Sequence, residues 1–188
     1  MQSDKIKYRR LFIALNIPEE TKEKLLELRD SIPLKAECSR EPKEKLHLTI
    51  SFLGNVEEQK IPQIESFLDE IAMFNKFICL ITNFEFFGMA GIPKVLYAKI
   101  VADQILFRIE KYFVECLENL DILTEQKHFK PHITLMREKK TATEEFVKTF
   151  SSFRFKTFFF QATEVVLYES VLEPLGSTYK KLKTIYLS

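Results

Sequence analysis

Apolar and polar side chains alternate along several stretches of the chain, which is the pattern of a β-strand with one buried face. The stretch KPHITLMR at 130–137 is an example, because Ile133 and Leu135 alternate with polar neighbours. Pro131 stands at its start, where a missing backbone N–H is tolerated. A turn with glycine and proline at 88–93 joins two other apolar runs. The expected strands are 8–15, 46–53, 76–88, 94–101, 130–137, about 153–160, about 163–169 and about 178–187.

Apolar residues spaced three or four positions apart indicate amphipathic helices between these strands. Pro18 begins the first helix, at a position where its fixed φ and missing donor are harmless. Segments 61–71 and 105–120 each carry one apolar stripe, and a short helix is expected near 142–150. Because the order mixes helices with strands that can pair as hairpins, the expected fold class is α+β. No low-complexity linker divides the sequence, so residues 1–188 are expected to form a single domain.

The composition excludes several classes of function. Only four of the 188 residues are Gly, and no glycine-rich phosphate loop is present. The formal net charge is +1, so any contact with nucleic acid is expected to be local. Three widely spaced cysteines fit a reducing compartment and argue against a disulfide scaffold or a structural zinc site. The N-terminal region has too short an apolar run for a signal sequence or a membrane span, and we expect a cytoplasmic protein without a membrane partner.

One polar pattern occurs twice on predicted strands. The segments KLHLTI at 45–50 and KPHITL at 130–135 both have Lys, any residue, His, an apolar residue, Thr and an apolar residue. The chain has three histidines, and two of them occupy this pattern. A strand His and Thr alone are usually structural, but the duplication favours a shared chemical role.

Strand geometry gives the pattern a chemical meaning. Successive side chains alternate between faces, so His47 projects with Thr49, and His132 projects with Thr134. Imidazole has an ordinary pKa of about 6.5 and acts as an acid or a base near neutral pH. Two such strands facing each other would place a base behind an entering water and an acid behind a departing oxygen, as in-line displacement at phosphorus requires. The Thr hydroxyls could donate to the phosphoryl oxygens.

Other sites have weaker support. His128 and His132 are four residues apart, but Pro131 lies between them and no third ligand has suitable spacing, so no metal is expected. The sequence has no G-x-S-x-G motif for a nucleophilic serine. The phenylalanines of FRFKTFFF, at 153–160, are expected in the core rather than in base stacking. Basic residues flank both motifs and could steer a phosphate-bearing substrate: Lys43, Lys45, Lys127, Lys130, Arg137, Lys139 and Lys140.

The chain resembles the two-histidine phosphoesterase superfamily, which is marked by a pair of His-x-Thr-x motifs. Within it, the chain is similar to the RNA 2′,3′-cyclic phosphodiesterase family, also called 2′-5′ RNA ligase or LigT-like. The matching segments are RRLFIALNIPEE, EKLHLTISFLGNV, FEFFG followed by PKVLYAKI, FKPHITLMR and YESVLEPLGSTYKKL, in the family's order. The resemblance implies a bilobal α+β fold, with two related lobes of antiparallel sheet around a central cleft.

The resemblance also implies roles for particular residues. It implies that His47 is the proton donor and His132 the proton acceptor, and that Thr49 and Thr134 hold the phosphate. Arg137 matches an arginine that usually follows the second motif. Strand alternation, however, places Arg137 on the face opposite His132, so that it would reach the cleft only where the strand ends or twists.

Three functions follow as hypotheses. The first is metal-independent hydrolysis of RNA 2′,3′-cyclic phosphate ends, tRNA fragments among them, to 2′-phosphomonoesters, with reversible 2′-5′ ligation. No cofactor is expected, and the active species is expected to be a monomer. The second is hydrolysis of a small cyclic nucleotide such as ADP-ribose cyclic phosphate. The third is an RNA-binding module without catalysis.

Overall fold

The computed structural model describes residues 6–32, 38–89, 92–124, 128–138, 148, 152–174 and 176–188. The strands are β1 (Tyr8–Asn16), β2 (Cys38–Arg40), β3 (His47–Glu57), β4 (Phe77–Met89), β5 (Ile92–Ala102), β6 (His132–Glu138), β7 (Phe158–Ala162), β8 (Glu164–Glu173) and β9 (Gly176–Tyr186). The helices are α1 (Glu19–Asp30), α2 (Ile61–Glu70) and α3 (Gln104–Glu118), with short 3-10 helices at Lys43–Lys45, Glu58–Lys60 and Ile71–Met73.

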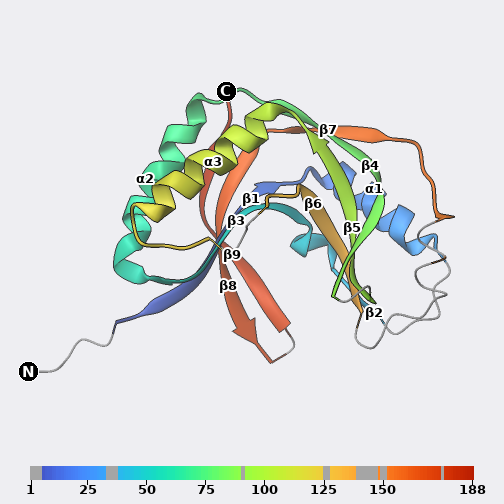
Figure 1. Ribbon diagram of the computed structural model, residues 1–188, viewed down its shortest axis with the longest axis horizontal. Helices are drawn as coiled ribbons and strands as arrows, with labels where there is room; N and C mark the ends of the chain where they lie inside the picture. Colours follow the sequence, from blue (N-terminus) through green and yellow to red (C-terminus); the bar gives the residue numbers. More distant parts are fainter. Residues whose placement is uncertain are drawn as a thin grey trace, which may run out of the picture.

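The strands form one antiparallel sheet in the order β7-β4-β5-β6-β3-β1-β8-β9, with β2 also paired to β6. The sheet is narrowest at its middle, where β3 and β6 share a single residue pair, Leu48 with Ile133. β4, β5 and β6 run at the right of Figure 1, whereas β8 and β9 project below its centre. We call β7, β4, β5 and β6 the His132 half, and β3, β1, β8 and β9 the His47 half, after the motif histidine that each carries. These halves correspond to the two lobes expected from the sequence.

One face of the junction is packed into the core. Leu48 and Ile133 are fully buried, as are Ile50 and Leu135 farther along the two motif strands. Leu25 of α1 belongs to the same apolar cluster. Since side chains alternate along a strand, the burial of these residues turns the motif histidines toward the other face of the sheet.

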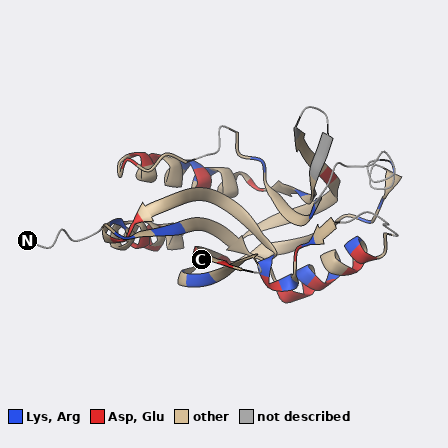
Figure 2. Ribbon diagram, turned by 90° about the horizontal axis from the view of Figure 1, so that it is seen from below, with Lys and Arg blue, Asp and Glu red and all other residues tan. Residues whose placement is uncertain are grey.

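The helices cover this core with their apolar residues and carry much of the charge. α2 and α3 lie side by side (Figure 1), and the Tyr112 hydroxyl donates to the Phe67 carbonyl at 3.3 Å. The Asp103 side chain caps α3 by accepting from the Ile105 N–H at 2.9 Å. Lys, Arg, Asp and Glu are concentrated on α1, whereas the strands near the junction show few charges (Figure 2). None of the helices in the described ranges is long and apolar enough to span a bilayer.

The α+β class and the expected strands and long helices are confirmed, with changes at their ends. The strand expected at about 153–160 begins only at Phe158, and the one expected at about 163–169 continues to Glu173. β2 was not expected from the sequence, because three residues carry no periodic signal. The helix expected near 142–150 falls, apart from Lys148, outside the described residues, as does Gly91 of the expected turn.

Candidate active site

Each motif histidine is held by the carbonyl two residues before it. His47 Nδ1 lies 2.7 Å from the Lys45 carbonyl oxygen, and His132 Nδ1 lies 2.7 Å from the Lys130 carbonyl oxygen. A carbonyl can only accept, so Nδ1 carries the proton in both rings. Nε2 is therefore the nitrogen that each neutral imidazole offers as a base, and the nitrogen that gains a proton when the ring becomes an acid.

Aromatic rings fix the orientation of His47. Its centroid lies 4.9 Å from that of Phe12 and 5.4 Å from that of Tyr179, which meets it edge-on at 84°. The ammonium group of Lys45 lies 5.9 Å from the Tyr179 centroid, within the range of a cation–π contact. Lys45 thus contributes its carbonyl to the imidazole and its side chain to the ring beside it.

The surroundings of His132 repeat this arrangement. The Phe87 ring meets His132 edge-on at 83°, with the centroids 4.8 Å apart. Tyr97 packs against the same imidazole at 5.3 Å. The ammonium group of Lys130 lies 5.6 Å from the Phe87 centroid. The two halves therefore hold their histidines with the same three kinds of contact: a carbonyl, an edge-on ring and a lysine over that ring.

Burial shifts the pKa of both histidines downward. Burial lowers the pKa of His47 to about 4, and the nearby positive charges of His132 and Arg137 act in the same direction. Burial also lowers the pKa of His132, again with Arg137 contributing. The carbonyl bonds to Nδ1 oppose these shifts in both rings. Both imidazoles are consequently neutral at pH 7, and the two rings and the guanidinium lie close enough for their charges to interact.

A β-bulge in β6 corrects the alternation argument about Arg137. Thr134 and Met136 pair with adjacent residues of β5, so Leu135 is an extra residue without a partner of its own. Leu135 and Met136, next to each other at the bulge, are both buried. After the bulge, the side chains of β6 point to the opposite faces from those that regular alternation predicts. Arg137 therefore lies on the same face as Thr134.

β3 contains the same irregularity at the same place. Thr49 pairs with Ala14 and Phe52 pairs with Phe12, two positions away on β1, so the three-residue step on β3 includes one extra residue at Ile50. Phe52 is 39% exposed and lies on the face of Thr49. In both halves the fifth residue after the motif histidine therefore lies on the same face of the sheet as that histidine. This residue is Phe52 in the His47 half and Arg137 in the His132 half.

Buried polar contacts stabilise the bulge in β6. The Leu135 carbonyl accepts from the Glu41 N–H at 2.9 Å and from Arg29 Nη1 at 3.5 Å. Arg29 is only 6% exposed and also donates to the Glu41 carbonyl at 2.6 Å. The Glu41 carboxylate in turn accepts from Arg137 Nε at 2.9 Å. Arg29 and Glu41 thus connect the conformation of the bulge to the position of the Arg137 guanidinium.

The remaining residues singled out in the sequence have varied surroundings. Thr49 is 6% exposed, and Thr134 is half-buried. His128 is exposed in a bend. Lys43 forms ion pairs with carboxylates of α1. Lys127, Lys139 and Lys140 lie outside the described residues, and within the described part of the chain no three His, Cys, Asp or Glu side chains gather as metal ligands would.

Sequence reasoning did not find Phe52, Glu41 or the rings around the histidines. The only available signal for Phe52 was that it and Arg137 both stand five residues after a motif histidine. Regular alternation of side chains places the fifth residue after a histidine on the opposite face of the strand. Alternation therefore argued against this signal, because it assumes a strand without bulges.

Comparison with known proteins decides the family. A model of the family described as "LigT like Phosphoesterase" matches residues 15–97. A Thermus thermophilus protein named RNA 2′,3′-cyclic phosphodiesterase is 33% identical over 139 residues, covering 71% of this chain and 70% of that protein. This chain belongs to the LigT-like phosphoesterases. A relative from Archaeoglobus fulgidus with the same name is 29% identical over 176 residues, covering 93% of this chain and 98% of its own length.

Solved structures agree with this family assignment. A crystal structure of a protein from Thermus thermophilus superimposes with a TM-score of 0.80 at 28% identity, covering 95% of this chain and 97% of that one. Escherichia coli LigT in complex with 3′-AMP superimposes with a TM-score of 0.79 at 21% identity, covering 97% of this chain and 99% of that one. The LigT-like fold is therefore shared over nearly the whole chain.

Proposed function

We propose that this chain hydrolyses 2′,3′-cyclic phosphate ends of RNA to 2′-phosphomonoesters by paired-histidine acid–base catalysis without a metal ion. The observation that carries the proposal is the matched pair of imidazoles, each with Nδ1 on a carbonyl oxygen. The names of the relatives support RNA cyclic phosphates as the substrate class. We further propose that the protein acts as a monomer in the cytoplasm, on ends such as those of tRNA fragments.

The proposed reaction is a single in-line displacement. His132 Nε2 accepts a proton from water as the water oxygen bonds to phosphorus. The bond from phosphorus to the 3′ oxygen breaks, and His47, in its imidazolium form, delivers a proton to that oxygen. The products are a 2′-phosphate and a free 3′-hydroxyl. With the 5′-hydroxyl end of a second RNA in place of water, the same displacement gives a 2′-5′ linkage.

The other site residues act on the phosphoryl oxygens. The hydroxyls of Thr49 and Thr134 donate to the non-bridging oxygens, where negative charge concentrates in the transition state. Arg137, on the histidine face because of the bulge, supplies a positive charge to the same group. Phe52, on the same face in the other half, offers a partly exposed ring for the terminal base.

A short RNA with a 2′,3′-cyclic phosphate end tests this function. Phosphorus NMR of the product separates a 2′-phosphate from a 3′-phosphate, and a parallel reaction with excess chelator tests metal independence. The proposal predicts a 2′-phosphate at an unchanged rate. A 3′-phosphate, or a rate lost on chelation and restored by a divalent ion, would contradict it.

A further inference from the structure

Four apolar side chains are exposed together on the His132 half of the sheet. Val101 of β5, Leu80 of β4 and Phe159 of β7 are cross-strand neighbours in one row. Their exposed fractions are 48%, 37% and 65%, and Ile78, two residues before Leu80, is 42% exposed. We call these four residues the apolar platform. Contiguous apolar surface of this kind marks a binding site more often than isolated exposed residues do.

The apolar platform shares its face with the candidate active site. Lys99 is the cross-strand partner of His132, and Val101 stands two residues farther along β5. Ile100 between them is 4% exposed, so alternation is regular there and Val101 faces the same way as His132. From the spacing of strands and residues, Phe159 lies at most about 16 Å from His132 across the sheet.

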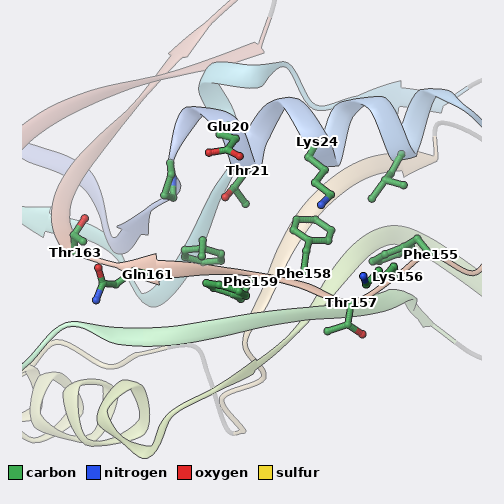
Figure 3. Close-up of a pocket in the computed structure, with 13 residues that line it drawn as sticks. Glu20, Thr21, Lys24, Phe155, Lys156, Thr157, Phe158, Phe159, Gln161 and Thr163 are labelled. Atoms are coloured by element: carbon green, nitrogen blue, oxygen red, sulfur yellow. The ribbon is translucent and has the colours of Figure 1, made fainter.

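A groove begins at the edge of the sheet, around β7 from the apolar platform, on the side that α1 covers. β7 is the end strand, and a cavity of about 910 Å³ lies between it and α1 (Figure 3). Phe159 and Gln161 line this groove, so Phe159 belongs both to the groove and to the apolar platform. Lys24 and Lys156 also line it, and Lys24 Nζ lies 4.2 Å from the centroid of the Phe158 ring. Beyond Phe159, two lysines (Lys24 and Lys156) and one carboxylate (Glu20) therefore line the groove.

We propose that the apolar platform and the groove bind the single-stranded RNA that precedes the cyclic phosphate. This rests on the proposed function, because it places the cyclic end at the histidines. The cyclic phosphate closes the 3′ terminus, so the rest of the chain extends only in the 5′ direction. Bases stack on exposed sheet aromatics without sequence preference, and phosphates pair with lysines. Phe159 takes the base, and Lys24 and Lys156 take the phosphates, which makes oligonucleotide ends better substrates than mononucleotides.

Substrates of graded length test the proposal. The wild-type kcat/KM is expected to rise from a mononucleoside 2′,3′-cyclic phosphate to oligonucleotides with the same end. Phe159→Ser is expected to lower kcat/KM about 5- to 150-fold for the oligonucleotides, the effect of losing one base stack, and to leave kcat/KM for the mononucleotide unchanged. The matched control is Tyr186→Ser, because Tyr186 is 67% exposed on β9, at the other edge of the sheet. Tyr186→Ser should leave kcat/KM unchanged for substrates of every length.

A second measurement uses the unmodified protein. RNA with 4-thiouridine at successive positions upstream of the cyclic phosphate is irradiated, and the crosslinked peptide is identified by mass spectrometry. The proposal predicts crosslinks within 156–161. The proposal would be overturned if Phe159→Ser lowered kcat/KM equally for substrates of all lengths. It would also be overturned if the crosslinks lay only in segments outside 156–161. The proposal would also be overturned if sedimentation showed that Phe159→Ser dissociates a dimer while the preference for longer substrates stays the same. The apolar platform would then bind a second copy of the chain. If no cyclic phosphate is turned over, the proposed function fails, whereas the crosslinks still decide where RNA binds.

Discussion

The lowered pKa values of the two histidines predict an unusual pH dependence. Catalysis needs one imidazolium and one neutral imidazole at the same time. In the free protein the pKa of His47 is about 4 and that of His132 is also below its usual range. Below both values each ring is protonated and no base remains; above both values each ring is neutral and no acid remains. Because kcat/KM reports the free protein, its profile should be a bell with its maximum below pH 6.5.

The bound substrate should move the optimum of kcat upward. A cyclic phosphate diester carries one negative charge across this pH range, and that charge stabilises the imidazolium. At about 4 Å and an effective dielectric constant of about 20, the attraction is about 4 kcal/mol. This corresponds to about 3 pKa units and would bring His47 from about 4 to about 7 in the complex. The kcat profile should therefore lie at higher pH than the kcat/KM profile by up to about 3 units.

Steady-state rates on a short cyclic-phosphate RNA between pH 4 and 9 provide the assay. A buffer series of constant ionic strength is needed, because salt also screens the attraction between the substrate and Arg137. A kcat/KM maximum above neutral pH, or coincident profiles for kcat and kcat/KM, would refute the reasoning. NMR titration of the imidazole protons, with and without a phosphate ligand, measures the same shift independently of turnover.

Other substitutions have distinct expected effects. Alanine at either motif histidine should lower kcat by about 10²–10⁴-fold, and Thr49→Ala or Thr134→Ala should cost less in the same rate assay, because each removes one hydrogen bond. Glu41→Ala should lower kcat/KM by less than about 5-fold, since exposed ion pairs contribute about 0.2–1 kcal/mol, and a double-mutant cycle should show no further effect once Arg137 is alanine. Gly54→Ala should lower stability in a thermal melt by about 1 kcal/mol, because Gly54 has φ +66° even though the space around it is open.

The histidine strands were predictable because they combine two strong local signals, a period of two and a repeated motif. The apolar residues Leu48 and Ile133 occupy the buried face that alternation assigns to them. The first helix was likewise predictable from Pro18 and the helix formers after it. These features depend on interactions between residues that are close in sequence.

Features that depend on distant partners were not predictable. The bulge at Leu135 is stabilised by Arg29 and Glu41, which lie far from it in sequence and carry no local sign of this contact. FRFKTFFF shows the same limit. Phe158 and Phe160 pack with the core as expected, but Phe159 is 65% exposed, because it points to the other face of the sheet, where its row neighbours Leu80 and Val101 are also exposed.

The matching contacts of the two motif histidines have a consequence for the direction of the reaction. Because the two imidazoles are held by the same kinds of contact, these contacts alone do not decide which imidazole donates the proton and which accepts it. The direction must come from positions where the halves differ. The fifth residue after each histidine is such a position, with a neutral ring at Phe52 and a cation at Arg137. Exchanging these two side chains is therefore a way to ask whether a phosphodiesterase can be made to use its acid and its base in the opposite order.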